Sequence, residues 1–133
     1  MPAQAAYEYL CDGVSVGRWA LGSFGARRVA ANLFRGESLF DGTALLFRPV
    51  GNPERLEVDY HVGAVAAKLV PRAMARVIPG ATLGRAKNSC VVSLLAWREA
   101  SIPDERWARL VACHEVEILL IQAQLAQRRS KRK

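Results

Sequence analysis

The chain has 133 residues, of which 51% are hydrophobic and 23% are charged, and its formal net charge is +7. That length suits one domain, and that composition excludes a disordered or fibrous chain because it supplies enough apolar surface for a core. The longest uncharged apolar stretches, 88–97 and 118–127, are far shorter than the roughly 20 residues that span a bilayer. Residues 1–12 lack the positive start and apolar run of an export signal. We therefore predict a cytoplasmic protein with no membrane contact.

The positive charge is concentrated at the end of the chain. Residues 128–133 hold five of the seven excess charges and leave +2 for the rest. We predict one domain over 1–127, followed by a basic, disordered tail over 128–133. The three cysteines, Cys11, Cys90 and Cys113, are odd in number and widely spaced, which fits neither a disulfide scaffold nor a zinc site. We expect free thiols in a reducing compartment, with no metal and no cofactor.

The first predicted element is a β-hairpin. Asp12-Gly13 separates two strand-like runs, 7–11 and 14–19, and a two-residue Asp-Gly loop is a strong hairpin signal. Glycines then interrupt the pattern. The alanines and arginines of 26–34 predict a short helix that stops before the next glycine.

Two strands follow the predicted short helix. Residues 43–47 are apolar and strand-like, and the turn residues of 50–54 lead into a strand at 56–62. Within 56–62, Leu, Val, Tyr and Val alternate with Glu, Asp and His, the period-two pattern of a strand with one buried side. We expect these two strands to pair antiparallel.

The second half of the chain predicts two helices around one strand. Residues 64–78 contain several alanines and predict a helix that is kinked or restarted by its proline. The apolar run 89–97 suits a buried strand, and 101–104 has the polar residues of a cap for a final helix over 102–127. The resulting order, β-β-α-β-β-α-β-α, predicts an α+β fold: a mainly antiparallel sheet with helices on one face and a long apolar C-terminal helix.

The first candidate site lies on the polar side of the strand 56–62. Glu57, Asp59 and His61 are two apart, so they project from one face and could place an imidazole beside two carboxylates. Such a group could act as a general base or as part of a metal site. No further ligand stands at a recognisable spacing, so the simpler interpretation is the solvated side of a half-buried strand.

The second candidate lies on the final helix, where His114 and Glu117 are three apart and face the same way. Helical metal sites use this pair in the opposite order and repeat it on other helices, so the metal interpretation is the weaker one. His114 also falls in the apolar register of the helix. That position favours a histidine in the core or in an interface.

The third candidate is a set of basic residues. A helix over 64–78 would align three of them at four-residue spacing as a ridge, and such ridges bind phosphate backbones through counterion release. The alternative is a solvated helix face with a solubilising tail. The predicted polyanion-binding residues are Lys68, Arg72, Arg76, Arg85, Lys87, Arg128 and Arg129.

The final helix bears on partners. Residues 118–121 are consecutive and apolar, so they point around the whole helix and require burial on several sides. Either a second subunit or the chain's own sheet could cover them, and periodicity alone also permits a strand over 116–122. If a second subunit covers the helix, the interface residues are Trp107, Val111, His114, Ile118, Ile121 and Leu125.

These features favour a small non-enzymatic binding or accessory protein, a homodimer, that contacts nucleic acid or another polyanion, such as an acidic protein, through the ridge and the tail. One alternative is a small enzyme or ligand-binding domain with a pocket beside His61. Another is a dimerisation or adaptor module that acts through the final helix alone. No nucleophile, nucleotide or metal signature in the sequence favours catalysis.

Overall fold

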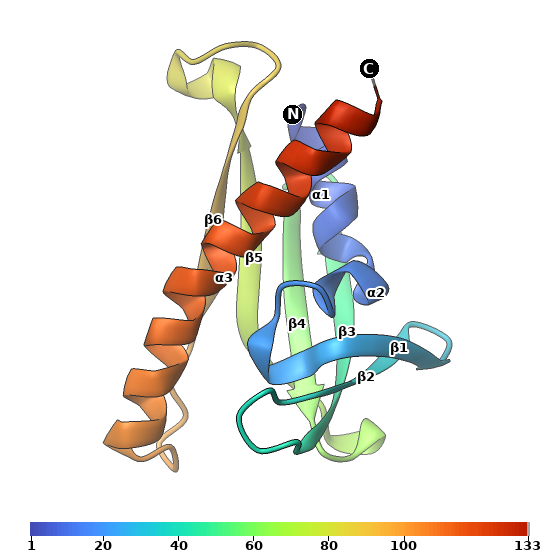
Figure 1. The fold of residues 1–133 in the computed structure, drawn as a ribbon, viewed down its shortest axis with the longest axis vertical. Helices are drawn as coiled ribbons and strands as arrows, with labels where there is room; N and C mark the ends of the chain where they lie inside the picture. The colour runs from blue at the N-terminus through green and yellow to red at the C-terminus, as the bar shows by residue number, and fades with distance from the viewer. Residues whose placement is uncertain (133) are drawn as a thin grey trace.

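The structure is a computed structural model that describes residues 1–132. It contains six antiparallel strands, preceded by two helices and followed by one long helix (Figure 1). The strands pair in chain order, β1-β2-β3-β4-β5-β6, which is the α+β fold that the sequence predicts. The helices are α1 (Ala3–Cys11), α2 (Gly13–Val16) and α3 (Asp104–Lys131), and the short 3-10 turns are η1 (Leu21–Ser23), η2 (Ala66–Lys68) and η3 (Gly80–Leu83). The strands are β1 (Phe24–Ala30), β2 (Leu33–Glu37), β3 (Ala44–Asn52), β4 (Glu57–Gly63), β5 (Val70–Pro79) and β6 (Cys90–Ala96).

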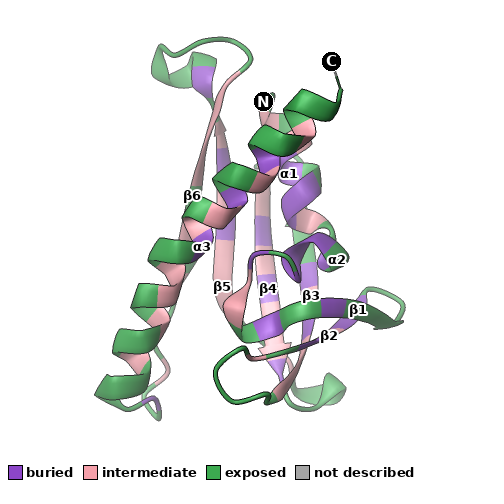
Figure 2. Ribbon diagram, viewed as in Figure 1, coloured by how far each residue is buried: buried purple, intermediate pink, exposed green. Residues whose placement is uncertain are grey.

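The core lies between the helices and one face of the sheet, called the inner face here. Val58 and Tyr60 of β4 and Val77 of β5 are buried on that face. The hydroxyl of Tyr60 donates a hydrogen bond of 2.8 Å to the carbonyl oxygen of Leu10, which ties α1 to β4. Figure 2 shows buried residues on α1, on α2 and along the middle strands. From α3, Ile121 joins the same cluster.

The predicted N-terminal hairpin is wrong, because residues 3–16 form α1 and α2. Asp12 caps α2 instead of entering a turn. Its carboxylate accepts hydrogen bonds from the backbone N–H of Val14 (3.3 Å) and from the hydroxyl of Ser15 (2.5 Å). An aspartate satisfies the free N–H groups of a starting helix as readily as it enters a hairpin turn, so the same residue supports both predictions.

The predicted helix over 26–34 is also wrong, because this segment forms the β1–β2 hairpin. Asn32 has a positive φ of 47°, a conformation that asparagine tolerates better than most residues, and the chain reverses there. Ala26 and Phe34 are buried on the two strands. Packing beneath α2 therefore overrides the helical preference of the alanines and arginines.

The third error is the helix predicted over 64–78, which is η2 followed by β5. Within β5, Ala73, Ala75 and Val77 alternate toward the inner face, and Ala75 is fully buried. Helix α1 packs over this strand. Alanine spacing that suggested a helix is thus the period-two pattern of a strand under a helix.

The other predicted elements are present with shifted ends. β3 and β4 pair antiparallel as expected, although β3 continues through its proline to Asn52. β6 matches the predicted strand. Helix α3 ends at Lys131, so it includes residues 128–131, which the sequence placed in a disordered tail, and Lys133 lies outside the described residues. Within residues 1–132, no helix is long and apolar enough to cross a membrane.

Helix α3 is more exposed than the sequence predicts, because few of its residues are buried. Its buried residues are Glu117, Ile121 and Leu125, which form one stripe at four-residue spacing. Leu119 lies on the other side of the helix and is 61% exposed. The apolar run 118–121 is therefore covered on one side of the helix and open on the other.

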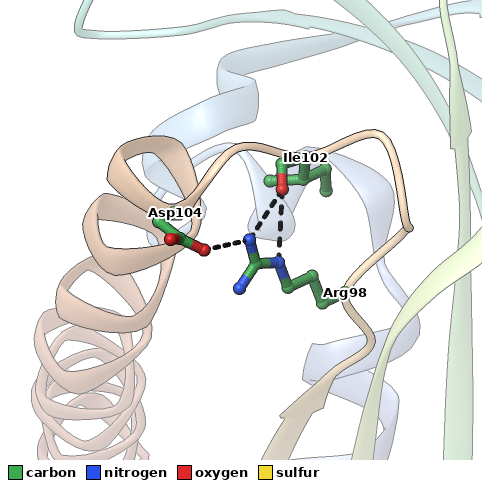
Figure 3. Close-up of polar contacts among 3 residues, drawn as sticks. All are labelled: Arg98, Ile102 and Asp104. Carbon is green, nitrogen blue, oxygen red and sulfur yellow. Dashed lines mark hydrogen bonds and ion pairs between the residues drawn. The ribbon is translucent and has the colours of Figure 1, made fainter.

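The start of α3 is held by Arg98 rather than by the predicted cap (Figure 3). The helix has no side-chain cap hydrogen bond. The guanidinium of Arg98 donates to the carbonyl oxygen of Ile102 at 2.9 and 3.2 Å, and to a carboxylate oxygen of Asp104 at 2.6 Å. These bonds fold the loop between β6 and α3 and so set the direction in which α3 leaves the sheet.

The contact between α2 and β1 yields a prediction for Gly17. A Cβ on Gly17 would lie 2.2 Å from the backbone nitrogen of Ala26, whereas a Cβ on Gly22 would meet nothing within 4 Å. We expect Gly17→Ala to destabilise the fold by several kcal/mol, about 3 or more, because backbone must move, and the matched control Gly22→Ala to change stability by less than about 1 kcal/mol. Urea denaturation of both variants measures this. Equal stabilities would contradict the close packing of α2 on β1.

Candidate ligand-binding pocket

A cavity of about 280 Å³ opens between the inner face of the sheet and the first half of α3. Strands β3 to β6 form its floor, and α3 forms one wall. The segments 16–23 and 38–43 form the opposite wall. Segments far apart in the sequence therefore meet around one hollow, which is the geometry of a small-molecule site.

The interior of the cavity is mainly apolar and aromatic. Trp19 and Tyr60 meet edge to face with ring centroids 5.7 Å apart, and both are buried. Phe47, Val62 and Leu94 extend this surface along the sheet. An apolar ligand body placed here would bury aromatic surface, the main source of affinity in such pockets.

Glu117 is the buried carboxyl group in the lining of the cavity. It is 7% exposed, and its carboxylate accepts a single long hydrogen bond of 3.4 Å, from the backbone N–H of Leu21. Burial raises the pKa of Glu117 to about 7, and the hydrogen bond from Leu21 offsets this only in part. Glu117 is therefore divided between its acid and its carboxylate near neutral pH.

Two more titratable residues of α3 line the cavity beside Glu117. Burial lowers the pKa of His114, so its imidazole is neutral near pH 7. Burial also raises the pKa of Cys113, with a further contribution from the charge of Glu117, so the thiol stays protonated. A protonated thiol is a poor nucleophile, so these residues do not form an activated Cys-His pair.

The mouth of the cavity carries several charged groups. The guanidinium of Arg109 lies 4.9 Å from the ring centre of Phe40, and Arg106 lies one turn earlier on α3. Arg72 of β5 pairs with Glu99 at 3.1 Å. Asp41 is the acidic residue at this mouth, and hydrogen bonds from Thr43 lower the pKa of its carboxyl.

Two buried donors around the cavity have no hydrogen-bond partner within the described part of the chain. They are the indole Nε1 of Trp19 and the Nε of Arg72. Buried donors in native proteins are nearly always satisfied, by protein or by ordered water. Trp19 is 3% exposed and lines the cavity, so its indole N–H is a buried donor available to an acceptor in the cavity.

Glu57, Asp59 and His61 do not contribute to this cavity. They alternate with Val58 and Tyr60 along β4 and so occupy the opposite face of the sheet, whereas the cavity takes Tyr60 and Val62. The carboxylate of Glu57 forms ion pairs with Arg55 at 3.3 Å and with Arg76 at 3.6 Å. The observed cavity therefore lies on the other side of the strand from His61, and a site beside His61 stays a prediction. Among residues 1–132, no group of three or more His, Cys, Asp or Glu side chains is placed to hold a metal ion.

The predicted basic ridge does not exist as a helix face. Lys68 lies in η2, while Arg72 and Arg76 lie on β5, each paired with a glutamate. Arg85 and Lys87 are exposed after η3, at the other end of β5 from η2 (Figure 1). The predicted set is therefore divided between two ends of the sheet.

The residues predicted as a helix interface mostly face the chain's own body. Ile121 and Leu125 are buried in the core, and Ile118 packs against it. His114 lines the cavity, and Val111 is exposed. The register Trp107 to Leu125 thus mostly marks the side of α3 that meets this chain, and an interface through these residues stays a prediction.

The sequence pointed to the His114 and Glu117 spacing and to Arg72 as a polyanion-binding residue, but not to most other cavity residues. Trp19 lies just after α2, and Arg106 and Arg109 lie on α3, so no local sequence motif joins them. The useful signal was a glutamate at a buried register position of an apolar helix, because an acid there needs a special environment.

Comparisons with known proteins agree with the fold and go no further. No protein-family model matches the chain, and no curated protein matches its sequence. A solved structure from Bacillus thuringiensis, described as a putative uncharacterized protein, is similar with a TM-score of 0.63. The likeness covers 92% of this chain and 90% of that one at 13% identity. At that identity the likeness is one of fold alone.

The raised pKa of Glu117 predicts how stability depends on pH. Below pH 4.5 the carboxyl of Glu117 is protonated in both the folded and the unfolded chain, so it does not lower the free energy of unfolding. As pH rises from 4.5 to about 7, the unfolded chain ionises more easily, so stability falls by about 3 kcal/mol and then stays level. Urea denaturation should show that Glu117→Gln is about 3 kcal/mol more stable than the wild type at pH 8 and about equally stable at pH 4.

The exposed Glu115 on the same helix gives the matched control for this measurement. We expect Glu115→Gln to follow the wild type within about 0.5 kcal/mol at both pH values, since surface substitutions have small effects. A Glu117→Gln variant that tracks the wild type across this range would show that the carboxyl is not desolvated.

Proposed function

We propose that this protein is a binding protein for a small amphipathic organic anion, held in the cavity between α3 and the inner face of the sheet. The observation that supports it best is the division of the cavity lining. The interior is aromatic and aliphatic, while Arg106 and Arg109 outnumber Asp41 among the exposed charged residues of the lining. A ligand with an apolar body and an anionic head matches both parts.

Glu117 fits this ligand in its protonated form. A neutral carboxyl can lie against an apolar ligand body at little cost, and it can donate a hydrogen bond to a ligand oxygen. An ionised Glu117 would instead repel an anion. Binding should therefore be tighter below the pKa of about 7 than above it.

Titrations with octanoate, octanol and octylamine test the proposal, because the three share one apolar body and differ in the head group. Calorimetry should show one saturable site with octanoate tightest and octylamine weakest. The exposed double variant Arg106→Gln, Arg109→Gln should remove the preference for octanoate over octanol. An equal preference in the wild type and this variant would mean that the arginines do not recognise the ligand.

A cavity-filling variant tests the location of the site. Ala96 lines the cavity, whereas Ala86 is exposed after η3 and does not. We expect Ala96→Phe to weaken octanoate binding by at least tenfold because the new ring occupies the cavity, and Ala86→Phe to leave binding unchanged. Circular dichroism checks that both fold. A folded Ala96→Phe variant that binds as well as the wild type would place the ligand elsewhere.

A second candidate function is binding of a polyanion such as nucleic acid at one end of the molecule. It is favoured by the position of η3 and of the end of α3, which lie at the same end (Figure 1). The first residue of the chain also bonds to Asn88 beyond η3, which ties α1 to this end. Arg85, Lys87 and Arg129 are exposed there, and such groups bind phosphates without reading bases.

A salt titration of binding to a labelled oligonucleotide tests this second function. We expect Arg85→Ala, Lys87→Ala to weaken binding and to reduce the slope of log K against log salt by about 2, one for each lost phosphate contact. The matched control, Arg27→Ala, Arg28→Ala, changes two exposed arginines of β1 and should leave the slope unchanged. Equal effects of both pairs would indicate nonspecific attraction to net charge.

A further inference from the structure

The side of α3 that faces away from the sheet is apolar over most of its length. Exposed residues recur there at spacings of four, three, four and three: Ala112, Val116, Leu119, Ala123 and Ala126, called the outer seam here. Val116 is 47% exposed and Leu119 is 61% exposed. A helix face in water is normally charged, so an apolar face of this length requires an explanation.

The four-three spacing of the outer seam is that of helices that pack side by side. In such pairs apolar residues repeat every three and four positions, and each inserts between residues of the facing helix. Charged residues are sparse along this face. Between 108 and 126, the charged residues among the exposed positions are Arg109 and Glu115. The guanidinium of Arg109 lies over the ring of Phe40, so it is drawn toward the body of the chain.

We propose that α3 pairs through the outer seam with α3 of a second copy of this chain, antiparallel, with Leu119 on the two-fold axis. The seam is nearly symmetric about that residue. Ala112 of one copy then meets Ala126 of the other, and Val116 meets Ala123, so the central layer, Leu119 against Leu119, is the layer with two large side chains. The alanines allow the two helices to approach closely at both ends of the contact.

The charges of α3 select the second copy and its direction. The first turn carries the exposed Glu105, and the last turn carries the exposed Arg129 and Lys131. Asp104 and Arg128, in the same two turns, already contact Arg98 and Ser15 of their own chain. An antiparallel pair places the acidic start of each helix near the basic end of the other, and it also opposes the two helix dipoles. A parallel pair would bring the two basic ends together. This pairing is independent of the cavity, which lies on the other side of α3.

The assembly in solution tests the pairing. Sedimentation equilibrium of the wild type should show a dimer of the 14.6 kDa chain at micromolar concentration. Leu119→Glu should weaken dimerisation at least 100-fold, while Gln127→Glu, the same charge outside the seam, should not. Both residues are exposed in the single chain, so both variants should fold. A wild type that stays monomeric at millimolar concentration, or a Leu119→Glu variant that dimerises normally, would overturn the proposal.

Cysteine cross-linking tests the direction, in a background where the three native cysteines are replaced by alanine. Leu119→Cys should oxidise rapidly to a disulfide dimer. Val116→Cys should not, because in the antiparallel pair the two copies of residue 116 lie about 9 Å apart along the axis, at 1.5 Å per residue, beyond disulfide reach. Equal cross-linking at 116 and 119 would indicate a parallel pair and overturn the proposed geometry.

Discussion

The hydrogen bond from Tyr60 to the carbonyl oxygen of Leu10 joins the two layers of this molecule. Tyr60 is buried on the central strand β4, and Leu10 lies in the last turn of α1. The bond fixes where α1 ends and therefore where α2 turns back over β1. Trp19 follows that turn and packs edge to face against the ring of Tyr60. One tyrosine thus sets both the position of the N-terminal helices and one wall of the cavity.

Helix α3 is anchored at its far end to the same corner. Arg128 donates to the hydroxyl of Ser15, which donates to the carboxylate of Asp12, and the guanidinium also lies 4.5 Å from the ring centre of Tyr9. Arg98 holds the other end of the helix. Between these anchors Glu117, Ile121 and Leu125 are buried, while the first half of α3 stands over the cavity. The cavity therefore lies under the part of α3 that precedes its buried residues Ile121 and Leu125.

The pattern of right and wrong predictions follows the range of the forces involved. Strand β4 was predictable because Val58 and Tyr60 alternate with polar residues, and this local pattern indicates a strand with one buried face. The hairpin predicted at Asp12 failed because aspartate supports a turn and a helix cap equally well. The helix predicted over 64–78 failed because the alanines of this strand face elements far away in the sequence: Ala75 lies in the core that α1 covers, and Ala73 lines the cavity. Nothing local distinguishes an alanine that favours a helix from one that makes room for another element.

The sequence by itself determined an α+β composition, the strands β3, β4 and β6, and a long final helix, because each depends on periodicity within a short window. It also contained the outer seam, since that spacing is readable in the chain, but not which side of α3 would remain open. Only the tertiary structure decided that Glu117 lies in a cavity, that Arg72 and Arg109 belong to one mouth, and that the basic residues are divided between two ends. Those relations join residues far apart in sequence, and their energies depend on burial that no single segment possesses before the chain folds.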